Sequence, residues 1–155
     1  FSLTGAAYRL RVPLTVHPGI GYDIIYTHPL ANGAGLGRAA HADFRIFVDS
    51  ILNLEGGVFL SVGSAIMAPQ VFEKAMSIAN NLRLQEGREE LQPFILVNDL
   101  ASVDWDWSRG EPPQDNPAYY LRFCKSFSRM GGEMVYAGGD NRVLLTNLLH
   151  ALEQG

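Results

Sequence analysis

The chain has little cysteine and no long apolar segment. Cys124 is the single cysteine among 155 residues, so an intrachain disulfide framework is excluded and a reducing compartment, the cytoplasm, is expected. No apolar run approaches the ~20 residues that span a bilayer, and the amino end lacks the layout of a signal peptide, so we expect no membrane association. Because the sequence begins at Phe1 and not at methionine, we expect a processed product or a fragment that lacks an amino-terminal part.

Basic residues and the common catalytic signatures are also scarce. Twelve Lys and Arg against 16 Asp and Glu give a net charge of −4, which supplies no basic stripe for nucleic acid and favours a small-molecule or protein partner. The P-loop, the G-x-S-x-G elbow, C-x-x-C and H-E-x-x-H are all absent. The four histidines form no pair at metal-ligand spacing, so no metal site is expected. They are His17, His28, His41 and His150.

What is present is an alternation of short apolar runs and helical periodicity. With 47% apolar residues, the chain can bury the core of one domain over residues 1–155. Strand-sized runs lie at Pro13–Val16, Asp23–Tyr26, Val58–Val62, Phe94–Val97 and Met134–Tyr136. Helical spacing links Phe44 to Leu54, Val71 to Leu82, Tyr120 to Phe127 and Val143 to Leu152. This order predicts a three-layer α/β fold with a mainly parallel sheet covered on both faces.

The segment from Asp104 to Asn116 separates two of these elements and carries both tryptophans. It is too polar and too rich in proline for regular structure. Trp105 and Trp107 are expected either in an active-site wall or in an aromatic cluster packed over the sheet edge.

Small and polar residues follow three of the expected strands. They are Gly63-Ser64, Asn98-Asp99 and Gly138-Gly139-Asp140. Because the carboxyl ends of parallel strands meet at one edge, these residues should line a common crevice, where open α/β sheets bind nucleotides. An acidic residue there suits ribose hydroxyls, although Asp140 has an alternative role as the N-cap of the last helix.

Two further patterns have competing interpretations. Gly33-Ala34-Gly35-Leu36-Gly37 partly matches a dinucleotide fingerprint, but Arg38 replaces its last glycine, so a flexible turn is the better interpretation. His17 and Asp23 flank Pro18–Gly21 and form a candidate acid–base pair, or they satisfy the local backbone of a turn.

The order of these motifs resembles the carboxyl-terminal half of deoxyhypusine synthase. The resemblance runs from Val12-Pro13 through Gly63-Ser64 and Val97-Asn98, then Asp104 six residues later, to Tyr136-Ala137 and Asp140. It implies a Rossmann-like sheet that binds NAD. It also implies a catalytic role for Lys125, eight residues after Pro117, at the position of the lysine that forms an imine with the butylamine group of spermidine.

The chain departs from that family at the residues nearest the expected lysine. Tyr119, Phe123 and Cys124 stand where the family has glutamate, tryptophan and glycine, and Ser61-Val62-Gly63 replaces its triple glycine. A polyamine needs buried acids to replace its water, so we expect no deoxyhypusine formation.

Three functions therefore stay open. The first is a deoxyhypusine synthase-like domain that binds a nucleotide such as NAD, as a homo-oligomer, because the aromatic residues exceed what one domain covers. The second is a non-catalytic interaction or scaffold domain. The third is a small-molecule hydrolase or isomerase that uses His17 and Asp23.

Overall fold

The computed structural model describes residues 2–155 and divides the chain into two compact units. The first unit is Phe1–Ile51 and the second is Leu52–Gly155. None of the helices in the described residues is both long and apolar enough to cross a membrane.

The first unit is made of helices and irregular segments. Its helices are α1 (Leu3–Leu10), the 3-10 helix η1 (Ile24–Thr27) and α2 (Gly33–Leu52), whose last residue belongs to the second unit. Asn32 begins α2, since its Oδ1 accepts a hydrogen bond from the Gly35 N–H at 2.8 Å. The glycine-rich stretch after it is therefore the first part of a helix, and the flexible turn predicted there is wrong.

The second unit holds a sheet, two long helices and three short helical turns. The strands are β1 (Val58–Val62), β2 (Phe94–Asp99) and β3 (Glu133–Gly138). The long helices are α3 (Met67–Gln85) and α4 (Asn141–Gln154). The short turns are η2 (Trp107–Arg109), η3 (Pro117–Tyr120) and the π-helical turn η4 (Cys124–Ser128).

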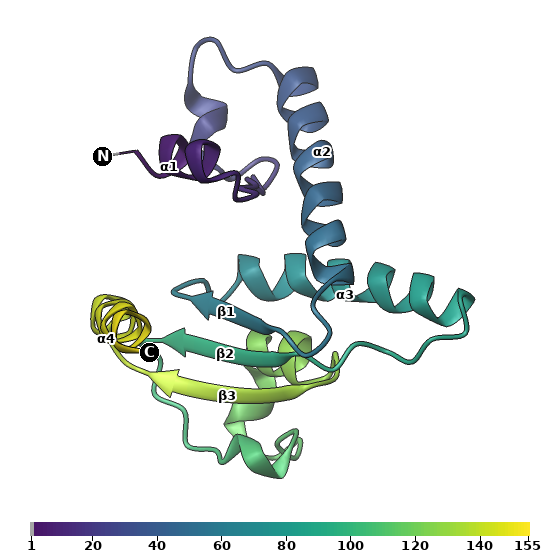
Figure 1. Cartoon of the computed structure of the whole chain (residues 1–155), viewed down its shortest axis with the longest axis vertical. Coiled ribbons are helices and arrows are strands. Elements are labelled where there is room, and N and C mark those ends of the chain that lie inside the picture. The colour runs from purple at the N-terminus through teal and green to yellow at the C-terminus, as the bar shows by residue number, and fades with distance from the viewer. Residues whose placement is uncertain (1) are drawn as a thin grey trace. The chain divides into compact units, whose positions relative to one another are not determined.

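The sheet has the order β1-β2-β3, and all its pairs are parallel (Figure 1). Leu60 pairs with Leu96, and Leu96 pairs with Val135, so side chains at these positions share one face. The predicted α/β class with a parallel sheet is confirmed. The strands expected at Pro13–Val16 and Asp23–Tyr26 are wrong: the first is irregular and η1 occupies most of the second.

One face of the sheet is covered by α3 and η4. The rings of Phe59, Phe72 and Phe127, from β1, α3 and η4, lie 4.4 to 5.7 Å apart between centroids. The Ser126 hydroxyl donates a hydrogen bond of 2.8 Å to Glu73, which also joins η4 to α3. Ile95 and Val97 of β2 are buried in the same layer.

The opposite face of the sheet is partly exposed. Val58, Leu60 and Val135 are 58%, 40% and 37% exposed. Within the second unit, α4 does not cover this face, because it lies beyond the carboxyl ends of β2 and β3 and has no buried residue (Figure 1). The elements of this unit therefore supply two of the three predicted layers.

Helices were predicted correctly where the helical spacing of apolar residues continues over ten residues or more. The periodicity from Phe44 onward belongs to α2, that from Val71 to α3, and that from Val143 to α4. The helix expected between Tyr120 and Phe127 is wrong as a continuous element. It is split into η3 and η4 because Leu121 is extended, with φ −68° and ψ 132°.

Candidate functional site

The three strand ends meet at the carboxyl edge of the sheet and are joined by backbone hydrogen bonds. The Gly63 N–H donates to the Asn98 carbonyl at 2.9 Å, and the Gly139 N–H donates to the Asp99 carbonyl at 3.0 Å. The structure therefore brings together the turns that the sequence placed in a common crevice.

Asn98 ties two of these turns together from a buried position. Its side-chain Nδ2 donates to the carbonyl of Ala137 at 2.7 Å and to that of Gly139 at 3.2 Å. Two carbonyl partners fix the orientation of the amide, because only the NH₂ group can donate to them. The residue is 3% exposed, and within residues 2–155 its buried Oδ1 accepts no hydrogen bond.

Asn141, the first residue of α4, adds a second acceptor of the same kind. Its Oδ1 is also buried and has no partner among the described residues. Its Nδ2 lies against Gly63, where a Cβ would overlap it, and Gly63 has a φ of +69°. Asn141 is not among the site residues predicted from the sequence, although it directly follows the predicted N-cap Asp140.

The other polar side chains predicted at this edge accept hydrogen bonds from backbone N–H groups close to them in the sequence. Ser64 Oγ accepts from the Ala68 N–H at 3.1 Å, and Asp99 Oδ1 accepts from the Ala101 N–H at 2.9 Å. Asp140 is the N-cap of α4, because its Oδ1 accepts from the Arg142 N–H at 2.8 Å. Gly138 is exposed at the end of β3.

The Arg142 guanidinium also pairs with the Asp140 carboxylate at 2.6 Å and holds its pKa below the usual range. The start of α4 therefore carries an ion pair with no net charge, and the Arg142 N–H is already bonded to the Asp140 side chain.

His17 and Asp23 lie in the first unit and have separate partners. The ring of His17 packs against Phe44 and Phe47, and its Nε2 is 3.0 Å from Thr15 Oγ1. Burial lowers the pKa of His17, against the opposing effect of the Asp43 carboxylate. Asp23 accepts a hydrogen bond from the Gly19 N–H. No hydrogen bond joins His17 to Asp23 in the described chain, and the Asp23 carboxylate is used by the local turn.

Lys125 lies in η4 beside two tyrosine rings. Its Nζ is 5.0 Å from the ring centroid of Tyr119 and 5.2 Å from that of Tyr120. Arg129 stacks on the Tyr119 ring at 5.1 Å and pairs with Glu111, whose pKa it holds below the usual range. Tyrosine faces attract the ammonium form of lysine, which is not the nucleophile that imine formation needs.

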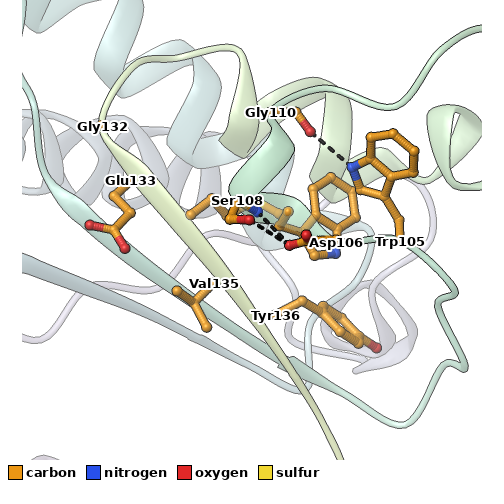
Figure 2. Close-up of a pocket in the computed structure, with 10 residues that line it drawn as sticks. Trp105, Asp106, Ser108, Gly110, Gly132, Glu133, Val135 and Tyr136 are labelled. Atoms are coloured by element: carbon orange, nitrogen blue, oxygen red, sulfur yellow. Dashed lines mark hydrogen bonds between the residues drawn. The ribbon is translucent and has the colours of Figure 1, made fainter.

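A hollow lies beside β3 (Figure 2). Its volume is about 600 Å³, and its walls are the loop around η2 and residues 132–136. Trp107 packs on Phe123, which stacks on Tyr136, so the aromatic cluster predicted over the sheet edge is present. Phe123 and Cys124 are buried, and burial raises the pKa of the Cys124 thiol.

The described residues contain no group of three or more His, Cys, Asp or Glu side chains placed to hold a metal ion. Comparison of the chain with protein-family models, with curated proteins and with solved structures gives no match.

Proposed function

We propose that the chain is a Rossmann-like domain of the deoxyhypusine synthase-like class that binds a nucleotide such as NAD at the carboxyl edge of its sheet. The proposal extends the two observed layers to a three-layer arrangement. It assigns the ligand to the strand ends around Gly63, Asn98, Gly139 and Asn141, and it excludes deoxyhypusine formation.

The observation that carries the proposal is the pair of buried acceptors, Asn98 Oδ1 and Asn141 Oδ1. A buried carbonyl oxygen without a donor costs ~1–3 kcal/mol, so two of them at one edge favour a ligand that brings donors. Ribose hydroxyls and the nicotinamide amide are such donors. The fit is to the sugar and amide portions of the nucleotide, because the two free atoms are acceptors and an ionised phosphate brings no donor.

Isothermal calorimetry of the full-length protein with NAD, NADH, ADP-ribose and AMP tests this function. We expect saturable binding of at least one of the sugar-bearing nucleotides. Asn141→Ala removes one acceptor and should weaken binding about five- to tenfold, which corresponds to one hydrogen bond of ~1 kcal/mol.

Asn116→Ala is the control for loss of an asparagine side chain away from the strand ends, because Asn116 is the N-cap of η3, where its Oδ1 accepts from the Ala118 N–H at 2.8 Å. It should leave binding unchanged. No heat and no thermal shift with any of the four nucleotides would remove the proposed function.

A non-catalytic interaction domain is the second candidate, and the surroundings of Lys125 favour it. An amine held against Tyr119 and Tyr120 as a cation is suited to packing and not to attack on a carbonyl. Incubation with spermidine and NAD followed by borohydride should therefore give no adduct on Lys125, and a spermidine-derived adduct there would restore the catalytic assignment.

A further inference from the structure

The outer edge of β3 has backbone groups that the sheet does not use. Glu133 and Gly139 donate their N–H groups to the carbonyls of Pro93 and Asp99, on the β2 side. In a parallel pair, residues that bond to a given neighbour alternate, so Val135 and Ala137 also face β2. The N–H and C=O groups of Met134 and Tyr136 therefore point away from the sheet, and no third strand pairs with them in the described chain.

The hollow of about 600 Å³ runs along this free edge. Its lining includes every residue from Gly132 to Tyr136, and these side chains alternate between the two faces of the sheet, so the hollow follows the strand itself. Figure 2 shows Glu133 and Val135 on one side of the strand and the loop of Trp105, Asp106 and Ser108 on the other.

The loop that forms the other wall is held in place by its own hydrogen bonds. Trp105 Nε1 donates to the Gly110 carbonyl at 2.9 Å, and Asp106 Oδ1 accepts from the Ser108 N–H and hydroxyl at 3.1 and 2.7 Å. Trp107 Nε1 is buried and has no acceptor within residues 2–155. The wall therefore offers a hydrogen-bond donor that neither the loop nor the strand uses.

The charged residues that line the hollow are all acidic. Asp106 and Glu133 are among its lining residues, and no Lys, Arg or His lines it. Arg109 of the same loop is stacked on the Trp105 ring, at 5.1 Å. A ligand with basic side chains is complementary to this surface.

We propose that the edge of β3 and the loop at 105–110 bind an extended, basic peptide segment of a partner protein, which adds to the sheet as a fourth strand. The two N–H and two C=O groups of Met134 and Tyr136 match the alternating groups of an extended backbone, and the five residues from Gly132 to Tyr136 offer about 3.3 Å of edge each. A second copy of this chain would bring its own 105–110 loop to the same edge, whereas a free segment brings only its backbone.

Amide hydrogen exchange by NMR on the full chain tests the proposal. The probe is an acetylated and amidated hexapeptide of alternating lysine and valine at millimolar concentration. In the free protein, the Met134 and Tyr136 amides should exchange at least tenfold faster than those of Val135 and Ala137. The probe should slow them at least tenfold and shift the Trp107 indole N–H signal, whereas the same peptide N-methylated at alternate residues should do neither.

Equal protection of Met134 and Val135 in the free protein would overturn the proposal, and loss of that protection on dilution would identify a second copy as the occupant. Unchanged exchange with the probe would overturn it as well.

Two charge-reversal variants test the chemistry of the partner. Glu133→Lys should weaken probe binding at least fivefold, whereas Glu153→Lys, the same change at an exposed position in α4, should not. Equal affinities of the two variants would show that the segment is not selected by charge.

Discussion

The backbone conformation of Gly63 and its contact with Asn141 both require a residue without a side chain at this position. Its φ of +69° lies in the left-handed region, and a Cβ would overlap Asn141 Nδ2. Gly63→Ala should therefore cost ~1–2 kcal/mol for the backbone alone, and it should also displace Asn141 and weaken nucleotide binding.

Gly87→Ala provides the matched control, because Gly87 has a φ of +73° and nothing within 4 Å of an added Cβ. Urea unfolding should show a loss of stability in both variants, and calorimetry should show weaker binding in Gly63→Ala alone. Equal binding by the two proteins would mean that Gly63 and Asn141 do not shape the site.

His17 gives the first unit a dependence on pH. Burial lowers its pKa below the ordinary value of 6.5, so the unfolded chain binds the proton more readily than the folded one. Stability contributed by the neutral ring is present above pH 6.5 and is lost as the pH falls below it. Melting curves from pH 7.5 to 5.5 should therefore show a larger drop for the natural protein than for His17→Gln. A drop of the same size in both would contradict this role.

The sequence was enough to predict which residues lie at the carboxyl edge of the sheet, but not which hydrogen bonds their side chains make. Gly63, Asn98 and Asp140 follow strands or begin a helix, and those positions alone placed them at one edge. The free oxygen of Asn98 depends on two carbonyls about forty residues further along the chain, that of Ala137 in β3 and that of Gly139 in the turn after it. Such a long-range contact cannot be predicted from the residues around Asn98 alone.

Among the elements, α4 depends on its cap more than on packing. It has no buried residue, and Asp140 satisfies the Arg142 N–H at its start. Asp140→Ala removes that acceptor and should lower the urea midpoint, whereas Asp140→Asn keeps an oxygen at the same place and should not. Circular dichroism with urea measures both variants, and equal midpoints would show that the cap is dispensable.

The two strands that were predicted wrongly have no neighbouring strand to pair with in the described chain. Pro13–Val16 has an apolar pattern, but a strand forms only where a neighbour completes its hydrogen bonds, and the Val16 N–H donates to Asp43 of α2 instead. At Asp23 the carboxylate accepts from the Gly19 N–H, which favours a tight turn followed by η1. By contrast, β1, β2 and β3 have apolar runs that pair with one another in register.

At the scale of the whole molecule, part of the aromatic surface expected to drive self-association is buried. Phe123 and Phe127 are buried in the second unit, so they are not surplus surface. The exposed apolar residues of that unit are mainly aliphatic, and they include Val58, Leu60 and Val135 on the open sheet face and four residues of α4. Parallel sheets are usually covered on both faces. Homo-oligomer formation therefore stays a prediction, and its basis is now the exposed apolar face of the sheet.

Light scattering at micromolar concentration measures the association. A dimer or tetramer is expected, and Leu60→Lys on the open face should shift it towards monomer, whereas Ile66→Lys, also exposed but outside the sheet, should not. A monomer in the natural protein would remove the prediction.

The central claim is that a nucleotide binds where Asn98 and Asn141 present their free oxygens. Titration of the ¹⁵N-labelled full-length protein with NAD, followed through the side-chain amide signals of Asn98 and Asn141 and the backbone signals of Gly63 and Gly139, tests it most directly. The account predicts that all four move together and saturate with one dissociation constant. Binding that leaves these four signals in place, or that moves only residues around Trp105 and Trp107, would contradict it.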